Sequence, residues 1–340
     1  MSPEAGFAPR TQQKRGPWGV LQSGLRELSL VPVIGLALVV GSFTSDAFLT
    51  TANFLNILQQ SSELSILVIA ETMIIIAGRF DLSLESVVGL APMVGAWLIV
   101  TSRGEGGSGF GVNPYVGLAA AFAAGGLVGF ANGFFVTKMR LNAFITTLAM
   151  LILARGITMG MTNGQTLYSL PPEYLFLGSG SLLGVPLSIW IAAALYIVFG
   201  LILRYHRLGR ALYAIGGNPE AAKVAGINVD RVIWGVYVLG GLLAALAGLM
   251  LTGRIASVVT SQGANMIFYV FAAAVIGGIS LNGGKGRLLG ALTGVLLLGI
   301  FQNILVLSQI AAFWIDACYG AIILFALILS WATSKQTDQV

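Results

Sequence analysis

The sequence predicts an all-α polytopic membrane protein with about ten transmembrane helices. Hydrophobic residues make up 56% of its 340 residues, charged residues make up only 9%, and the mean hydropathy is +0.89. Water-soluble domains of this length carry far more charge. Long apolar runs alternate with short polar segments, which is the pattern of membrane spans joined by loops. The single cysteine, Cys318, excludes an intrachain disulfide, and we expect no metal site because histidine and cysteine show no metal-ligating spacing.

The apolar runs give the expected order of the spans. Residues 1–27 are polar and basic and are expected to form a cytoplasmic tail, followed by a first span at 28–43. Residues 44–63 are amphipathic, which favours a segment at the membrane interface or one entering the bundle sideways before a second span at 64–77. Eight further runs complete the ten spans, at 84–101, 115–136, 144–161, 185–203, 232–251, 267–279, 288–306 and 311–331. The transmembrane domain therefore covers 28–332, and 333–340 form a second cytoplasmic tail.

The basic residues indicate the orientation in the membrane. Ten spans place both termini on one side, and the segments on that side carry most of the lysines and arginines. These are Arg10, Lys14, Arg15, Arg26, Lys138, Arg140, Arg204, Arg207, Arg210, Lys223, Arg231, Lys285, Arg287 and Lys335. The segments on the other side carry Arg103 and Arg254. Because basic residues concentrate in cytoplasmic loops, both termini are expected inside, and the net charge of +5 reflects topology rather than nucleic-acid binding.

The longest polar interval, residues 204–231, is predicted to be a cytoplasmic loop that contains one short helix. Asn218 is a favourable N-cap, Pro219 suits the first helical position, and Gly226 stops the helix. A helix this short is not stable alone, so it must dock on another surface. A solvated loop with a capped turn is the alternative. The residues concerned are Asn218, Pro219, Glu220, Ala221, Ala222, Lys223 and Gly226.

Residues 78–86, GRFDLSLES, interrupt the apolar run between the second and third spans. Arg79, Asp81 and Glu85 lie here together with Ser83. Charges at membrane depth are costly unless they pair or line a wet cavity, and a broken backbone survives there only where protein or water covers it. Two interpretations stay open. Either these residues take part in a transport pathway, or Arg79 and Asp81 form a turn that joins two spans at their cytoplasmic ends.

The motifs disfavour an enzyme and favour a transporter. No nucleophile elbow, catalytic dyad or metal triad is found, and GGKG at 283–286 fails the spacing of a phosphate-binding loop. Uphill transport then requires an ATPase on another chain or an ion gradient. An ion-coupled carrier requires acids inside the membrane, for which Glu71, Asp81 and Asp316 are the candidates. These three side chains are few and scattered along the chain.

Five segments of the sequence resemble, in order, the permease subunits of bacterial ATP-binding-cassette importers. They are FLTTANFLNILQQ (48–60), AGRFDLSLESVVGL (77–90), NAFITTLAMLILARGI (142–157), GRALYAIGGNPEAAKVAGI (209–227) and VIGGISLNGGKGRLLGALTGVLLLGIFQNIL (275–305). The resemblance is to the family that includes ribose-, xylose- and galactose-type sugar permeases and, more distantly, branched-chain amino-acid permeases. It covers nearly the whole chain beyond the N-terminal tail.

The resemblance implies a non-enzymatic subunit of the bacterial inner membrane that forms the pathway for a small polar solute. A monosaccharide is expected first, and a branched-chain amino acid or another small solute is the alternative. The implied partners are an ABC ATPase that binds the ATP, an extracytoplasmic solute-binding protein, and a second permease copy, identical or related. No cofactor of its own and no nucleic acid is implied. The short helix at 218–226 is then expected to dock into the ATPase.

The resemblance also suggests where solute passes. The candidate pathway residues are Asp81, Ser83, Asn142, Phe144 and Thr146. A polar group beside an aromatic ring suits sugar hydroxyls and ring faces, yet each of these residues can equally serve packing or helix capping. The residues 76–90 and 275–290 also resemble each other, since both place a glycine-rich break at the inner end of a helical hairpin.

One stretch and two single residues depart from the family pattern. Residues 266–269 read MIFY where a Tyr-Glu-Leu-Asp stretch is usual, Glu85 stands at a usual glycine, and Arg79 replaces an uncharged residue. These departures suggest a divergent subgroup with an altered solute or altered binding-protein docking. Arg155, in the predicted span at 144–161, is expected to be paired or near the outer surface.

Overall fold

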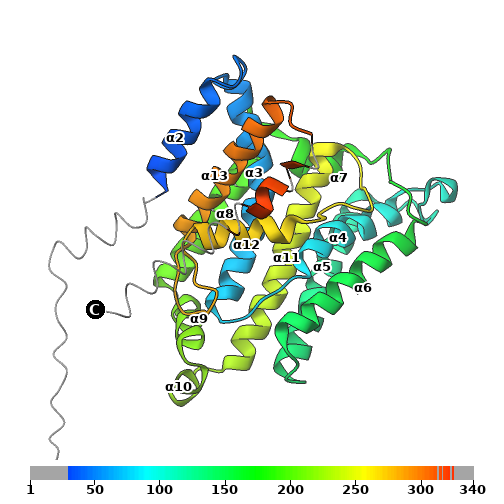
Figure 1. Ribbon diagram of the computed structural model, residues 1–340. Coiled ribbons are helices and arrows are strands. Elements are labelled where there is room, and N and C mark those ends of the chain that lie inside the picture. Colours follow the sequence, from blue (N-terminus) through cyan, green and yellow to red (C-terminus); the bar gives the residue numbers. More distant parts are fainter. Residues whose placement is uncertain (1–29, 312–313, 316, 322–323, 325–340) are drawn as a thin grey trace, which may run out of the picture.

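The computed structural model describes residues 30–311, 314–315, 317–321 and 324. The predicted tails at 1–27 and 333–340, most of the last predicted span, and Asp316 lie outside the described residues. Within them the chain is helical, apart from a two-stranded hairpin and the connecting loops (Figure 1). The helices are α2 (Val31–Ser42), α3 (Thr51–Ile76), α4 (Leu84–Ile99), η1 (Arg103–Glu105), α5 (Pro114–Thr137), α6 (Ala143–Met161), α7 (Pro172–Ser179), α8 (Leu187–Tyr205), α9 (Arg207–Gly217), α10 (Pro219–Val224), α11 (Val229–Ile255), α12 (Met266–Ile276) and α13 (Leu288–Leu307).

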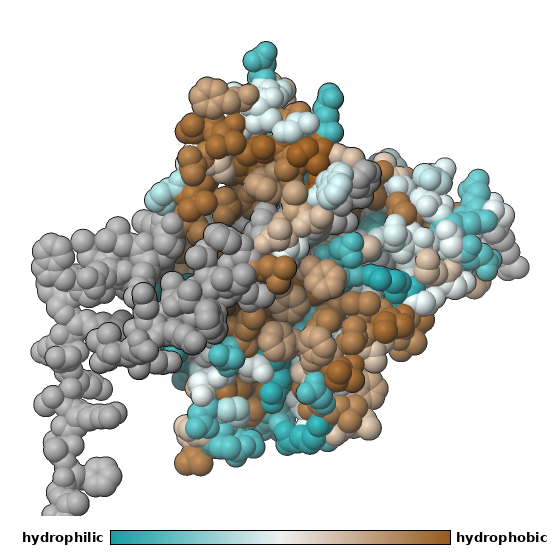
Figure 2. Space-filling model, viewed as in Figure 1, coloured by the Kyte–Doolittle hydropathy of each residue, from teal (hydrophilic) through white to brown (hydrophobic). Residues whose placement is uncertain are grey.

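The structure supports a polytopic membrane protein. Five described helices are long and apolar enough to cross a membrane: α5, α6, α8, α11 and α13. Helices α2, α4 and α12 are apolar but shorter, and α3 has the length but carries Glu63 and Glu71. Apolar side chains cover much of the visible bundle, and hydrophilic ones gather at its lower end, over α9 and α10 (Figure 2). Ten spans and the side on which each terminus lies stay predictions.

Helix α3 forms the centre of the bundle, which corrects the expectation for residues 44–63. The expected interfacial segment and second span are largely one continuous helix of 26 residues, capped where the Thr50 hydroxyl accepts a hydrogen bond from the Asn53 N–H. From Ser61 onward nearly every residue of α3 is buried. Residues 51–60 are mostly exposed or half-buried, whereas the polar residues from Ser61 to Glu63 are covered by protein: Glu63 accepts two hydrogen bonds of 2.7 and 3.0 Å from Arg254.

Close helix contacts are made through glycines. The pair Gly125 and Gly241 brings α5 and α11 together so tightly that a Cβ on either would collide with the other's carbonyl oxygen. Gly129 lies equally close to the backbone at Tyr237. Small residues allow this approach, and in a membrane such packing replaces the hydrophobic driving force between helices.

The polar connections gather at two opposite ends of the bundle. At one end Arg140, after α5, binds Asp230 at the start of α11, and Tyr213 of α9 binds the loop before α13. At the other end the connection between α6 and α8 contains α7 and the hairpin of β1 (Ser181–Leu182) and β2 (Val185–Pro186). Figure 1 shows α7 and α10 at these opposite ends. Arg254 lies in the last turn of α11 and not in a loop, because α11 extends four residues beyond the predicted span.

Candidate functional site

The short polar helix predicted in the 204–231 loop is present as α10. The Asn218 side chain caps it by accepting hydrogen bonds of 3.0 Å from the backbone N–H groups of Glu220 and Ala221. Pro219 occupies the first position, and Gly226 ends the turn with a φ of +83°, a conformation that glycine adopts without strain. The capping prediction is confirmed. The role of this helix in coupling stays a prediction.

Helix α10 presents most of its surface to the outside. Glu220 and Lys223 form an exposed ion pair of 2.7 Å along the helix. Val224 is 90% exposed, although it is apolar, while Ala222 is buried against the rest of the chain. A hollow of about 370 Å³ adjoins the helix. It is lined by Lys223, Gly226, Ile227, Asn228, Val229 and Asp230. Helix α10 thus exposes both a charged pair and an apolar side chain next to this hollow.

A second helix, α9, precedes α10 and was not predicted. It is amphipathic, with Gly209, Leu212 and Ile215 buried. Tyr213 donates a hydrogen bond of 2.8 Å to the carbonyl of Gly286, and burial raises the pKa of this tyrosine, so that its hydroxyl remains a donor. The signal for α9 was present as the spacing of leucine and isoleucine, but the surrounding arginines were read as loop.

The C-terminal end of α9 is packed directly against the end of α3. A Cβ at Gly216 would collide with the carbonyl oxygen of Ile76 and the backbone N–H of Gly284. Gly284 donates a hydrogen bond of 2.8 Å to the same Ile76 carbonyl, and Gly283 lies against Gly78. We call this set, Ile76, Gly78, Gly216, Gly283 and Gly284, the glycine junction. It joins α9, the end of α3 and the loop before α13 by backbone contacts alone.

A buried polar cluster begins at Asp81, three positions after Gly78 of the glycine junction. Asp81 is 1% exposed, and its Oδ1 accepts hydrogen bonds from the Ser83 N–H (2.9 Å) and the Ser83 hydroxyl (2.6 Å). Asn132 of α5 donates to Asp81 and, at 2.7 Å, to the Ser83 hydroxyl oxygen. Glu71 of α3 accepts from the Asp81 N–H at 3.3 Å, and Thr147 of α6 from the Leu82 N–H at 3.1 Å. The break between α3 and α4 is thus covered by protein, as the sequence required.

Glu85, one of the departures from the family pattern, is paired. Its carboxylate binds Arg155 of α6, which confirms that this arginine has a partner, and also accepts from the Ile267 N–H at 3.4 Å. The charge at a usual glycine position is therefore matched by a cation on a facing helix. Arg79 lies within the break, half-buried, and donates to the neighbouring Gly78 carbonyl at 3.4 Å.

The five candidate pathway residues do not form one site. Asp81 and Ser83 lie together in the buried cluster. Asn142 caps α6, Phe144 is 47% exposed, and the Thr146 hydroxyl donates to the Asn142 carbonyl at 2.7 Å. The neighbouring Thr147, and not Thr146, reaches the break.

Sequence reasoning missed Asn132 and Thr147 as members of the cluster. Asn132 is fully buried in an otherwise apolar span, and a polar side chain at that depth is itself a signal for a buried partner. Thr147 gave no such signal, since threonine hydroxyls commonly bond their own helix. Within the described ranges, no group of three histidine, cysteine, aspartate or glutamate side chains is arranged to hold a metal ion.

Comparison with known proteins gives the family. A family described as "Branched-chain amino acid transport system / permease component" matches residues 53–327. The ribose import permease protein RbsC of Escherichia coli (strain K12) is 36% identical over 309 residues, covering 90% of this chain and 93% of the relative. RbsC of Bacillus subtilis (strain 168) is 34% identical over 325 residues, covering 94% and 96%. The L-arabinose ABC transporter permease protein AraH of Azospirillum brasilense is 32% identical over 328 residues, covering 96% and 92%. The chain therefore belongs to the branched-chain amino acid transport system permease component family.

Proposed function

We propose that this chain is the membrane-spanning permease subunit of an ATP-driven importer in the bacterial inner membrane. Its solute is a monosaccharide, and a pentose fits best, because the relatives are named for ribose and L-arabinose. An ABC ATPase supplies the energy, an extracytoplasmic binding protein delivers the solute, and a second permease copy completes the pathway. The observation that carries the proposal is a continuous packed route from the exposed helix α10 to the buried break in the middle of the bundle.

The first step of this route is the ATPase contact. Helix α10 is too short to be stable alone, yet its cap, its buried Ala222 and its contact with α9 hold it in place while Val224 and Glu220 stay exposed. A rigid, exposed helix passes a displacement imposed by the ATPase on to the helices that it contacts, whereas a mobile loop does not. The expected ATPase docking residues are therefore those of α10 and the adjoining hollow.

The second step passes the displacement of α10 through α9 to the end of α3. Helix α9 is displaced together with α10, because only Asn218 separates the two helices. At the glycine junction α9 contacts the carbonyl of Ile76 without an intervening side chain, and the chain continues from there through Arg79 to Asp81. Backbone contacts are stiff, so a displacement of α9 moves the end of α3 and with it the buried cluster. The cluster joins α3, α4 and α5, so this displacement changes the relative placement of three helices.

A second permease subunit has room on the outer faces of α5 and α6. Leu127 and Phe130 of α5, and Ile145 and Ile152 of α6, are each more than half exposed. These faces contact lipid or another permease, and closed two-fold pairing of such faces places a pathway at the symmetry axis. The candidate residues Asn142, Phe144 and Thr146 lie at the start of α6 and belong to this exposed side.

Transport by reconstituted vesicles tests the proposal. The permease is inserted into liposomes with the ATPase and binding protein encoded beside it, and uptake of radiolabelled ribose and L-arabinose is measured with and without internal ATP. We expect uptake only when all three proteins and ATP are present. Leucine added in excess tests the branched-chain alternative: if leucine and not the pentoses is transported, the sugar assignment is wrong. Uptake by the permease alone under a proton or sodium gradient would contradict the ATP-driven mechanism.

The docking role of α10 has a matched test. Val224→Asp places a charge on the exposed tip, where no folded contact is lost, and is expected to abolish co-purification with the ATPase. Leu183→Asp is the control, because Leu183 is 86% exposed in the hairpin at the opposite end. If both variants retain the ATPase equally, α10 is not the docking element.

A further inference from the structure

One face of α8 is an uninterrupted apolar stripe that points away from the bundle. Trp190, Ile197, Leu201 and Tyr205 are 44%, 64%, 54% and 61% exposed. They recur at intervals of seven and four residues, so they share one side of the helix. The opposite side carries the buried residues of α8, among them Tyr196. An exposed apolar stripe with a tryptophan near one end and a tyrosine at the other is the surface of a span that faces lipid.

The chain turns sharply where this stripe ends. Helix α8 stops at Tyr205, His206 is extended with a ψ of 157°, and α9 begins at Arg207. The turn is rigid: a Cβ at Gly209 would collide with the backbone at Leu203, and the Nδ1 atom of His206 accepts a hydrogen bond of 3.2 Å from the Leu208 N–H. The elbow between α8 and α9 therefore holds its side chains in fixed positions.

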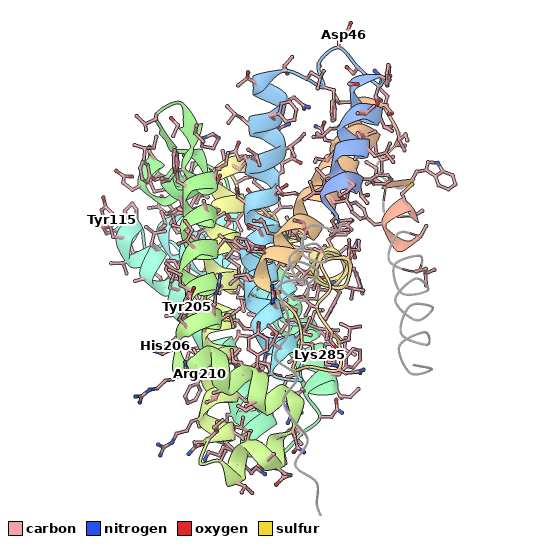
Figure 3. All side chains as sticks on the ribbon, turned by 90° about the vertical axis from the view of Figure 1, so that its left-hand side faces the viewer. Asp46, Tyr115, Tyr205, His206, Arg210 and Lys285 are labelled. Carbon is pink, nitrogen blue, oxygen red and sulfur yellow. The ribbon has the colours of Figure 1, made fainter. Side chains whose placement is uncertain are left out.

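Three arginines surround this elbow. The Arg204 guanidinium lies 5.1 Å from the centre of the Tyr205 ring, and Arg210 donates a hydrogen bond of 2.8 Å to the Tyr205 carbonyl. Because α9 buries Gly209 and Leu212, Arg207 and Arg210 lie on its outward side, three residues apart. In Figure 3, Tyr205, His206 and Arg210 lie along the side of the molecule at the lower end of α8. We call Arg204, Arg207 and Arg210 the arginine elbow.

Within the part of the chain that the structure describes, no acidic side chain pairs with the arginine elbow. All three arginines are exposed, and none takes part in the salt bridges found among residues 30–311. The segment from 204 to 217, RYHRLGRALYAIGG, contains no acidic residue. These guanidinium groups lie directly at the end of a lipid-facing stripe, which is the depth of the phospholipid headgroups. Arginine forms paired hydrogen bonds with phosphate there.

From this placement we infer that the arginine elbow binds the headgroup of an anionic phospholipid, whose acyl chains lie along the stripe of α8. The ATPase is the competing occupant of a basic cytoplasmic surface. The lipid is favoured because the elbow is continuous with the apolar stripe and lies on the side of the molecule, whereas α10 projects at its end (Figures 1 and 3). The bound lipid anchors the rigid elbow from which α9 starts, one helix before α10.

Lipid binding by the purified full-length chain tests the inference. Native mass spectrometry measures how much dioleoyl phosphatidylglycerol or dioleoyl phosphatidylcholine each protein retains from mixed micelles. We expect phosphatidylglycerol to be preferred, and Arg207→Gln combined with Arg210→Gln to weaken its binding more than about tenfold, since each basic residue near an anionic surface contributes about fivefold. Lys285→Gln is the matched control, because it removes one exposed charge at the same end but away from α8 (Figure 3).

The same variants separate lipid from ATPase. If the double variant keeps its preference for phosphatidylglycerol, or if Lys285→Gln loses as much binding, the arginine elbow is not a lipid site. If lipid binding is unchanged and co-purification of the ATPase is lost, the elbow belongs to the ATPase interface and the inference is wrong. Replacement of both arginines by lysine is expected to restore binding in part, because lysine keeps the charge but not the paired hydrogen bonds. Failure of ATP-driven uptake, tested above, would leave these outcomes unaffected.

Discussion

Helix α10 and the break between α3 and α4 are both short polar interruptions of an apolar chain, yet they are held by different means. Helix α10 is capped by its own Asn218, and its one ion pair, Glu220 with Lys223, joins neighbours on the same turn. The break is held by Glu71 of α3 itself and by two residues of other helices, Asn132 of α5 and Thr147 of α6. Substitutions in a locally stabilised segment are expected to change the free energy of unfolding little. A segment whose hydrogen bonds come from other helices depends on the packing of the whole bundle.

This difference predicts the largest effect at Asp81. Asp81→Ala leaves the Ser83 N–H and one donor of Asn132 without an acceptor in a buried site. Each such loss costs about 1–3 kcal/mol, so we expect the free energy of unfolding to fall by about 3 kcal/mol. The measurement is the melting temperature in detergent. Asp46→Ala, in an exposed loop at the other end, is the control and is expected to change little. Equal shifts would show that the cluster contributes no special stability.

How much of these two regions could be predicted from the sequence depends on how far apart the interacting residues lie along the chain. The cap, first proline and terminal glycine of α10 lie within nine residues, so pattern reasoning identified them. For the break, the sequence indicated that Asp81 must be covered, but not that Asn132, 51 positions away, would cover it. The resemblance between 76–90 and 275–290 was visible too. That the two breaks lie against each other, with Gly283 packed on Gly78, required the folded structure.

The pair of Glu85 and Arg155 shows the same limit. Each charge was noticed in the sequence, one as a departure and one as a span residue in need of a partner, but no local pattern joins positions 70 residues apart. The same holds for the start of α3. Its polar residues suggested a position at the membrane interface, because Arg254, the partner of Glu63, is distant in the chain. An amphipathic pattern shows which residues are polar and need hydrogen-bonding partners. It does not show whether water or protein provides these partners.

The ion pair at Glu85 predicts an asymmetric effect, second in size. The Glu85 side chain is 4% exposed, whereas that of Arg155 is 42% exposed. Arg155→Met leaves a buried carboxylate without its cation and is expected to cost about 2–3 kcal/mol. Glu85→Gln keeps an amide oxygen as an acceptor for Arg155, whose long side chain can also extend toward the end of α6, so the cost is expected to be smaller than for Arg155→Met. Melting temperatures of the two variants check this order, and the reverse order would contradict it.

The glycine junction links the two regions and predicts an effect on transport. Gly216→Ala forces a methyl group against the Ile76 carbonyl, so α9 must shift away from α3 at a cost of about 1–2 kcal/mol. We expect ATP-driven uptake to fall at least about tenfold while ATPase binding persists. Gly217→Ala is the control at the adjacent position, where an added Cβ meets nothing within 4 Å. Normal uptake by the Gly216→Ala variant would show that the glycine junction is not needed to couple ATPase binding to transport.

The smallest effect on global stability is expected at the cap of α10. Asn218→Ala removes the acceptor for two backbone N–H groups, and such caps contribute about 1 kcal/mol. Because α10 has six residues and is exposed, this loss is confined to the helix: amide exchange in 220–224 is expected to rise about fivefold, while the melting temperature stays nearly constant. Asn218→Ser, which restores an acceptor, is expected to return exchange toward its original rate. A large fall in melting temperature for Asn218→Ala would mean that α10 supports the bundle as strongly as the buried cluster does, and the distinction between a local and a global polar segment would fail.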